Sequence, residues 1–169
     1  LVLTMHAEAD YVEKALRASE ARYQNLFNGV PVGIYRTAPA GQFLDVNLAL
    51  VEMLGYPDRE ALLAVNAVDL YATPGDRKRW QALIEDEGLV RGFEVQFRRY
   101  DGTIVWVENN TRVVRNVDGR VLYYEGSSQD ITERKQAEET LRALYRASLH
   151  IQEPLGLRER LGRLLQTAR

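Results

Sequence analysis

The residue types that carry most enzymatic and metal chemistry are scarce in this chain. Its 169 residues include no cysteine and two histidines, His6 and His150, which are separated by most of the sequence. Disulfides and thiol chemistry are therefore excluded, and the His and Cys clusters that bind metals are not available. A Ser/His/Asp set would need one of these two histidines, and no glycine-rich phosphate loop is present. We expect no catalytic residues and no metal site within this chain.

Charged residues are plentiful but balanced, with 22 Lys and Arg against 24 Asp and Glu and a net charge of −2. A basic cluster at 77–79 and an acidic cluster at 85–87 fall on one predicted helix, and we interpret both as solvated surface. Nucleic acid or an anionic membrane would favour a basic excess, and no apolar run reaches the ~20 residues of a membrane span. We expect neither partner for this segment. Because the chain begins at Leu1, we expect it to be part of a longer protein.

A predicted β-hairpin late in the chain is followed directly by residues that can begin a helix. Two runs rich in Val, Ile, Tyr and Trp flank an Asp-Gly pair at 118–119, which is a strong turn signal. Directly after the second run come Asp130, Ile131 and Thr132. Asp130 can cap a helix while Glu133 reaches back, a variant of the capping box. We predict a strand that passes directly into a polar, amphipathic helix, which strain in the sheet would move.

Shorter segments upstream predict an α+β domain. The predicted strands lie at 33–38, 42–47 and 91–99, and the predicted helices at 48–54, 59–64, 67–71 and 74–87. Asn47, Asp58 and Thr73 are suited to cap three of these helices. The last of the three strands alternates apolar and polar residues, as a half-buried antiparallel strand does. Two strands, several short helices and three further strands together predict one antiparallel sheet.

Long amphipathic helices are predicted at both ends of the chain, with apolar or small residues in steps of three and four, the seam of a seven-residue repeat. The seam residues are Val12, Leu16, Ser19, Tyr23 and Leu26 at one end and Ala137, Leu141 and Leu144 at the other. Helices this polar bury little on one small domain, so we predict that they pair with a further partner. Residues 13–18 and 138–143 have similar sequences and occupy equivalent positions of the two seven-residue repeats. This similarity favours a modular protein in which helices of this kind join successive domains.

Several short motifs resemble, in order and spacing, those of PAS domains, the sensory modules of bacterial signalling proteins. They are Asn47-x-Ala49 with Leu54-Gly55-Tyr56, then Phe93 to Arg98, Asp101-Gly102-Thr103, Trp106-Val107 and Asp130-Ile131-Thr132. The resemblance implies a five-stranded antiparallel sheet with short helices on one face and long amphipathic helices at both ends. It also implies a cavity for a small ligand. Signals would pass through the flanking helices of a parallel dimer to a downstream output domain.

The resemblance divides the chain into four parts. Residues 1–28 are an N-terminal linker helix, 29–132 the PAS-like sensor domain, and 133–153 a C-terminal coiled-coil linker helix. Residues 154–169 begin a further helix or a GAF-like domain, after a break at Pro154. The output domain, a histidine kinase or a cyclic-dinucleotide enzyme, is expected outside this segment. We expect a cytoplasmic location, with any membrane anchor of the parent protein elsewhere in its chain.

The resemblance also gives candidate residues for the ligand pocket. The apolar candidates are Val51, Leu54, Leu70, Leu83, Phe93, Val95, Phe97 and Trp106, and the polar candidates are Tyr35, Asn47, Tyr56 and Asn109. Each of them could instead serve the core, where burying one apolar side chain contributes ~2 kcal/mol. Trp106 could also lie on the outer face of the sheet beneath a flanking helix, where its indole N–H would find a partner.

Cofactors known for this family are narrowed by the missing residue types. A cysteinyl-flavin adduct and a coumarate thioester both require cysteine, and a haem sensor usually uses a histidine inside the domain, so all three are disfavoured. Three alternatives remain. The cavity binds an uncharged or weakly polar small molecule, it binds flavin non-covalently and senses redox state, or it holds no ligand and the domain is a passive dimerisation and interaction module.

Overall fold

The computed structural model describes the backbone of residues 2–152 and the side chains of residues 11–148. The chain divides into two compact units, Leu1–Ile131 and Thr132–Arg169. The predicted start of a GAF-like domain at 154–169 lies outside the described residues, as do the side chains of His6 and His150.

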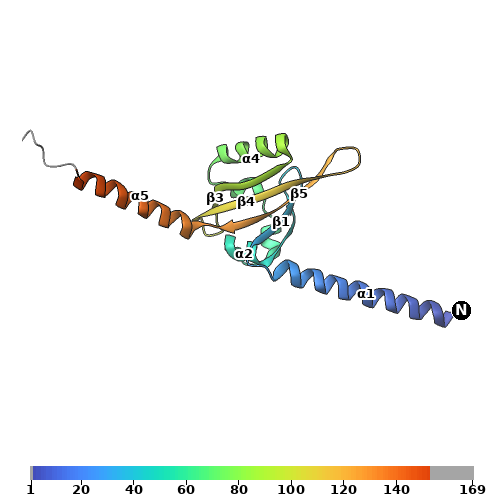
Figure 1. Ribbon diagram of the computed structural model, residues 1–169. Helices are drawn as coiled ribbons and strands as arrows, with labels where there is room; N and C mark the ends of the chain where they lie inside the picture. Colours follow the sequence, from blue (N-terminus) through green and yellow to red (C-terminus); the bar gives the residue numbers. More distant parts are fainter. Residues whose placement is uncertain (1, 153–169) are drawn as a thin grey trace, which may run out of the picture. The chain divides into compact units, whose positions relative to one another are not determined.

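A five-stranded antiparallel sheet forms the body of the first unit (Figure 1). Its strands are β1 Gly33–Thr37, β2 Phe43–Val46, β3 Leu89–Arg98, β4 Ile104–Arg115 and β5 Val121–Asp130. They lie in the order β2-β1-β5-β4-β3, so the last strand of the chain stands in the middle and joins the first hairpin to the second. The predicted α+β class and five-stranded antiparallel sheet are confirmed.

Short helices cover the inner face of this sheet. They are α2 Leu48–Leu54, α3 Arg59–Leu63, the 3₁₀ helix η1 Ala67–Leu70 and α4 Pro74–Glu87. Leu50, Leu62, Trp80 and Ile84 from these helices are buried in one core with the inward residues of the strands. A single apolar layer therefore holds the helices on the sheet.

Alternation along β3 places its apolar residues on the inner face, as predicted. Phe93, Val95 and Phe97 are buried. Val95 and Phe97 pair across the sheet with Val107 and Val105 of β4, which are fully buried. Because successive side chains of a strand point to opposite faces, the polar residues between them lie on the outer face.

The start of β3 contains a bulge that the sequence pattern did not predict. The strand begins at Leu89, two residues before the predicted start, and its register with β4 shifts between Val90 and Phe93. Gly92 in the bulge has φ of 58°, a left-handed conformation that favours glycine. Its backbone N–H donates a hydrogen bond of 2.9 Å to Oδ1 of Asn110 on β4.

Most of the predicted helix ends are confirmed. Asn47 and Asp58 cap α2 and α3 with hydrogen bonds from their side chains, and Gly55 ends α2 with φ of 71°. Thr73 stands at the predicted cap of α4, but its side chain makes no capping hydrogen bond. Pro74 already fixes the backbone angle of the first helical position, so this helix starts without the bond. The helix η1 was predicted, but its cap, Asn66, was not.

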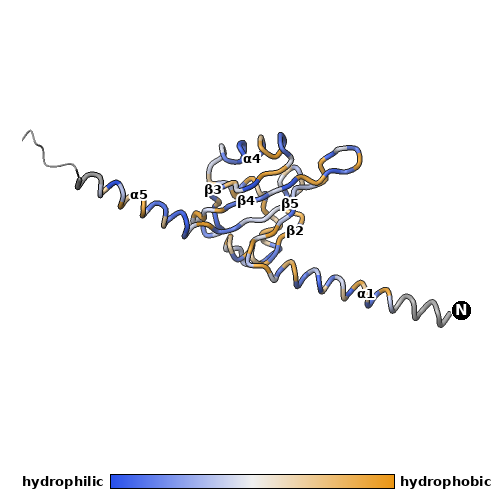
Figure 2. The backbone as a smooth tube through the Cα atoms, in the orientation of Figure 1, coloured by the Kyte–Doolittle hydropathy of each residue, from blue (hydrophilic) through white to orange (hydrophobic). Residues whose placement is uncertain are grey.

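The two long helices are α1 Val2–Asn28 and α5 Thr132–Gln152, as expected for the ends of the chain. Near its C-terminus α1 contacts the domain, where the hydroxyl of Tyr23 donates to Asp45 of β2 at 3.4 Å and the Tyr23 ring stacks on Phe27. In α5, hydrophobic residues recur among hydrophilic ones (Figure 2), and Leu141 and Leu144 are exposed. Homodimerisation through these helices stays a prediction.

Asn47 ties three elements together through one side-chain amide. Its Nδ2 donates to the carbonyl oxygens of Phe27 and Val32, both at 2.9 Å. Its Oδ1 accepts from the backbone N–H of Ile34 at 2.8 Å and of Leu50 at 3.1 Å. The side chain is fully buried, and it joins the end of α1, the start of β1 and the first turn of α2 through four buried or part-buried hydrogen bonds.

Replacing Asn47 should therefore destabilise the whole first unit. Asn47→Ala leaves buried backbone groups unpaired, and we expect the free energy of unfolding to fall by about 2–4 kcal/mol in urea titrations. Asn47→Asp keeps the two accepted bonds but sets an acceptor against the carbonyls of Phe27 and Val32, so we expect a similar loss. The control Asn66→Ala removes a partly exposed cap and should cost about 1 kcal/mol. Equal losses for Asn47→Ala and Asn66→Ala would contradict this role.

Candidate functional site

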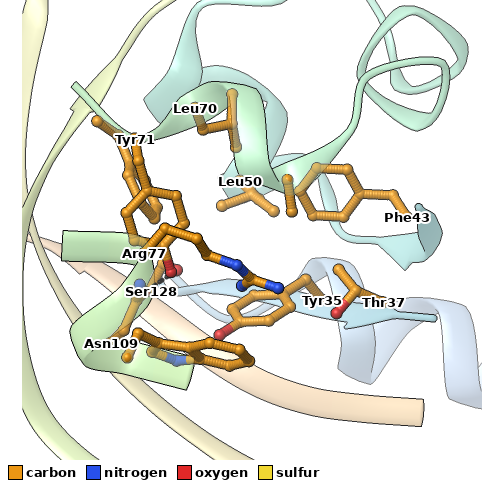
Figure 3. Close-up of a pocket in the computed structure, with 12 residues that line it drawn as sticks. Tyr35, Thr37, Phe43, Leu50, Leu70, Tyr71, Arg77, Asn109 and Ser128 are labelled. Atoms are coloured by element: carbon orange, nitrogen blue, oxygen red, sulfur yellow. Dashed lines mark hydrogen bonds between the residues drawn. The ribbon is translucent and has the colours of Figure 1, made fainter. Parts of the chain in front are cut away.

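A small cavity lies between the inner face of the sheet and the helices that cover it (Figure 3). Its volume is about 30 Å³, which is room for about one or two water molecules. All five strands and the helices α2, η1 and α4 contribute to its wall. The lining residues are Tyr35, Thr37, Phe43, Leu50, Ala67, Leu70, Tyr71, Arg77, Trp80, Phe97, Asn109 and Ser128.

One side of the cavity is built around the hydroxyl of Thr111 on β4. Tyr35 Oη and Thr111 Oγ1 share a buried hydrogen bond of 2.6 Å, and Trp80 Nε1 donates to the same oxygen at 3.4 Å. Gly126 of β5 lies opposite Tyr35 in the β1–β5 pair. A Cβ atom at Gly126 would lie 2.8 Å from the Tyr35 hydroxyl, so this strand position needs glycine. The Thr111 hydroxyl therefore connects β1 and α4.

Asn109 and Ser128 form a second polar group on the cavity wall. They lie opposite each other in the β4–β5 pair, and Ser128 Oγ donates to Asn109 Oδ1 at 2.5 Å. Both side chains are buried. The Asn109 amide and the Ser128 hydroxyl thus form one hydrogen-bonded pair in the wall of the cavity.

Two tyrosines of the cavity have perturbed acidities. Burial raises the pKa of Tyr35 far above its usual value, and the hydrogen bond with Thr111 opposes this rise only in part. Burial also raises the pKa of Tyr71, while the neighbouring Arg77 guanidinium partly offsets the rise. Both phenols therefore stay protonated at neutral pH and remain hydrogen-bond donors.

Arg77 corrects the prediction that residues 77–79 are all solvated surface. It is half-buried, and its guanidinium carbon lies 4.2 Å from the centre of the Trp80 ring and 5.7 Å from that of Tyr71. Positions three apart share one face of a helix, so Arg77 lies on the same core-facing side of α4 as Trp80. Aromatic faces attract the cation there. Arg79 stays largely exposed, as predicted, and pairs with Asp76 at 2.9 Å.

Eight of the twelve predicted pocket residues fall into two groups. Those that line the cavity are Tyr35, Leu70, Phe97 and Asn109. Those that are buried in the core without lining it are Val51, Leu54, Phe93 and Val95. Whether the lining residues bind a ligand stays a prediction.

Leu83 and Trp106 are corrections, because neither belongs to the cavity. Leu83 is 38 % exposed, since Trp80 and Ile84 turn the inner side of α4 toward the core and Leu83 falls outside that side. Trp106 lies between the buried Val105 and Val107 of β4, so strand alternation puts it on the outer face, where it is half-buried. The alternative position considered for Trp106 on that face is the one observed.

Asn47 and Tyr56 also lie away from the cavity. The amide of Asn47 is fully used by backbone partners and has no capacity for a ligand. Tyr56 is half-buried after the end of α2, where its ring centre lies 5.2 Å from that of Tyr100. Both are therefore structural positions in this fold.

Sequence reasoning missed most of the lining. The missed residues are Thr37, Phe43, Leu50, Ala67, Tyr71, Arg77, Trp80 and Ser128. Trp80 carried a usable signal, because it stands one helical turn from Ile84 and so shares its inward side. Ser128 became a lining residue only through the register of β5 against β4, which the sequence does not specify.

The exit of the domain is held by an arginine that the sequence analysis did not select. Arg99, just after β3, donates through Nε to the carbonyl of Met53 in α2 at 3.0 Å and through Nη2 to Asp130 at 3.0 Å. The backbone N–H of the buried Ile131 donates to the carbonyl of Trp106 at 2.9 Å. Helix α5 begins at Thr132, one residue later than a cap at Asp130 would place it, and the capping box stays a prediction.

A larger and more open hollow lies over the outer face of the sheet, bordered by Tyr23 and Phe27 of α1, with a volume of about 530 Å³. Beneath it Glu125 accepts hydrogen bonds from Arg36 at 3.1 Å and from Arg112 at 2.8 Å. Burial alone would raise the pKa of Glu125, but the bonds and charges of these arginines outweigh it and hold the pKa below its usual value. The outer face thus carries a small, internally paired charge cluster.

Within the described residues, no group of three His, Cys, Asp or Glu side chains is placed to hold a metal ion. In the same part of the chain, no helix combines the length and the apolar character that crossing a membrane requires.

The cavity under a five-stranded antiparallel sheet, with an exit strand that runs into a helix, matches a known family. A model of the PAS fold matches residues 21–131, more than half of the chain. The chain belongs to the PAS family. The resemblance inferred from the motifs is therefore confirmed, and this PAS chain can be compared with curated relatives.

Curated relatives of this PAS chain are signalling proteins. It is 28% identical over 142 residues to "Probable diguanylate cyclase DgcE" of Escherichia coli (strain K12), covering 82% of this chain and 13% of that protein. It is 27% identical over 142 residues to the sensor histidine kinase TmoS of Ectopseudomonas mendocina, covering 81% of this chain and 14% of that protein. The chain thus spans a small part of these relatives.

Solved structures share the PAS fold. An RNA-binding light-oxygen-voltage receptor is 26% identical with a TM-score of 0.64, covering 79% of this chain and 39% of that chain. The PAS domain of a Colwellia psychrerythraea protein is 23% identical with a TM-score of 0.58, covering 70% of this chain and 98% of that chain. At 23% identity, the similarity to the Colwellia psychrerythraea domain supports a shared fold and nothing further.

The raised pKa of Tyr35 predicts a loss of stability in alkaline solution. A phenol that is protonated in the folded state and has a normal pKa when unfolded stabilises the fold fully below pH ~10, and this stabilisation is lost as the pH rises further. We expect the unfolding free energy in urea to fall above that pH and to fall less in Tyr35→Phe. The control Tyr11→Phe, on an exposed part of α1, should retain the wild-type fall. An unchanged profile in Tyr35→Phe would contradict the assignment.

Proposed function

We propose that this PAS chain is a sensory and signal-relay module of a larger signalling protein. The observation that carries the proposal is the Arg99 bridge, which joins the carbonyl of Met53 in α2 to Asp130 at the end of β5. One side chain thereby links the helical layer over the cavity to the last residue before the exit.

The proposed route begins at the cavity wall. Leu50 of α2 lines the cavity, and Met53 stands one helical turn further along the same helix. A shift of α2 would move the carbonyl that Arg99 holds, and with it the partner carboxylate of Asp130. Because Ile131 is buried and bonded to β4, the displacement passes into Thr132 and α5 rather than into a loose linker.

The exposed seams of the two long helices support dimerisation as the second part of the proposal. Leu16 and Leu26 of α1 and Leu141 and Leu144 of α5 are more than half exposed in the single chain. Apolar residues at heptad spacing are covered when two such helices pair. Tyr23, another residue of the α1 seam, also donates a hydrogen bond to Asp45 of the same chain. In the proposed homodimer, a change in pairing of α5 would bias the output domain.

The output activity belongs to the parent protein. Relatives named as a sensor histidine kinase and a diguanylate cyclase support a parent of one of these two kinds, with its catalytic domain outside this chain. The PAS module itself is proposed to be non-catalytic and cytoplasmic. Its partners would be a second copy of itself and the downstream domain.

The cavity itself bears on the choice among ligands. Its volume of about 30 Å³ compares with ~300–1,000 Å³ for sites that hold drug-sized ligands. A non-covalent flavin would therefore require extensive opening, whereas a small molecule requires a local shift. The small volume also favours the second candidate function, a passive interaction module without ligand.

The two functions can be separated on the purified chain by native mass spectrometry and an absorption spectrum. A small molecule bound at one per chain supports the sensor, and a flavin band supports the redox alternative. A colourless dimer with no bound mass favours the passive module.

The relay can be tested by removing the charge of Asp130 in the full-length parent protein. Asp130→Asn breaks the ion pair with Arg99 but can still cap a helix. We expect the stimulus-dependent change in kinase or cyclase output to be lost, although the free energy of unfolding changes by less than ~1 kcal/mol because the pair is partly exposed. The control Asp118→Asn makes the same substitution at the exposed far end of the β4–β5 hairpin. A wild-type response in Asp130→Asn would refute the relay.

Dimerisation through the seams can be tested by sedimentation velocity. Leu16→Glu and Leu141→Glu together place charges in both seams, and we expect a wild-type dimer to become a monomer. Both side chains are exposed in the single chain, so the fold should survive. Ala18→Glu, on the side of α1 away from the seam, is the matched control and should remain dimeric. A monomeric wild-type chain would rule out this assembly.

A further inference from the structure

Arg77 is the one charged residue among those that line the cavity. Figure 3 shows its side chain extending into the middle of the pocket, between Tyr35 and Leu50. The guanidinium lies over the Trp80 ring, with its carbon 4.2 Å from the ring centre. An arginine on the surface of a helix would be expected to extend into water, so its inward position calls for a physical reason.

No carboxylate accounts for that position. Asp76, the neighbouring acid on α4, pairs with Arg79 instead. Among the described residues no Asp or Glu forms an ion pair with Arg77. A partly buried cation without an anionic partner is unfavourable, and contact with aromatic rings offsets this only in part. Aromatic stacking occupies a face of the guanidinium, and part of its N–H edge donates to the Tyr71 hydroxyl. The remaining N–H groups are of the kind that pair with a carboxylate.

The rest of the wall matches the remainder of such a ligand. Asn109 contributes a side-chain amide to the wall, and the protonated Tyr71 hydroxyl adds a donor. The other side of the cavity is apolar and includes Leu50 and Phe97. A cation and neutral donors opposite an apolar wall select an anionic head on an apolar body.

We propose that the cavity binds a small organic carboxylate, whose carboxylate group pairs with Arg77 and whose apolar body lies against Leu50 and Phe97. This inference rests on the proposed sensory function and names its ligand class. It differs from the uncharged or weakly polar ligand that was one of the three alternatives left open by the sequence, which had placed Arg77 on the surface.

The same contact explains how binding would reach the sheet. The cavity has too little free volume for even a short carboxylate, so the ligand must displace Arg77 or shift α4. Trp80, which stacks with Arg77, donates to Thr111 of β4 and contacts the Tyr124 ring of β5. Movement of Arg77 therefore changes the surroundings of Trp80, which tryptophan fluorescence would report.

The test uses the full chain with Trp106→Phe, which leaves Trp80 as its single tryptophan. The probes are propionate, butyrate, benzoate, the uncharged butyramide and inorganic phosphate, each titrated into the millimolar range. We expect at least one carboxylate to change the Trp80 emission with an affinity about 10-fold or more above those of butyramide and phosphate. No binding by any carboxylate, equal binding of butyramide, or equal binding of phosphate would each overturn the proposal.

Two variants on α4 assign the effect to Arg77. Arg77→Gln should weaken carboxylate binding by about 10- to 100-fold, whereas Lys78→Gln makes the same charge change at an adjacent exposed position and should bind as the wild type does. Matching melting curves of the two variants would show that both are folded. Unchanged binding by a folded Arg77→Gln would overturn the assignment.

Failure of this inference is distinguishable from failure of the proposed function. If the full-length parent protein carrying Arg77→Gln still responds to its stimulus while Asp130→Asn does not, the relay stands and the carboxylate ligand is wrong. If Asp130→Asn also responds, the relay itself is wrong, whatever the titrations show.

Discussion

One buried side-chain amide fixes the geometry on which the remainder of this PAS domain depends. Asn47 satisfies two carbonyls and two N–H groups where α1 ends, β1 begins and α2 starts. These backbone groups are buried or part-buried, so leaving them unpaired would cost stability. The amide therefore sets the position of α2 relative to β1, and α2 in turn supplies Leu50 to the cavity and the Met53 carbonyl to Arg99.

The domain combines a rigid apolar layer with a small cavity whose wall includes hydrogen-bonded polar groups. Val95, Val105 and Val107 are packed without exposure to solvent, and such packing resists gradual deformation. The cavity, in contrast, is bounded by hydrogen bonds centred on Thr111 and on Asn109. Polar contacts there can be exchanged more readily than the apolar layer can be compressed. The structure therefore localises adjustment to the cavity side of the sheet.

The sequence predicted what depends on local periodicity and missed what depends on register. Alternation in β3 and the caps at Asn47 and Asp58 follow from nearest neighbours along the chain, and the structure bears them out. The inward turn of Arg77 and the outward turn of Trp106 depend on which side of an element faces the core, which the residue types alone left ambiguous. Arg99 joins residues that lie far apart in sequence, so no local pattern could have indicated its role.

The bulge in β3 also limits how copies of this domain can meet. β3 stands at the border of the sheet, where a regular strand would offer its free backbone groups to a strand of another molecule. The shift between Val90 and Phe93 bends that border, and Gly92 turns its N–H inward to Asn110. A bulge at an edge strand disfavours continuation of the sheet from one molecule into the next, which is the arrangement found in fibrils.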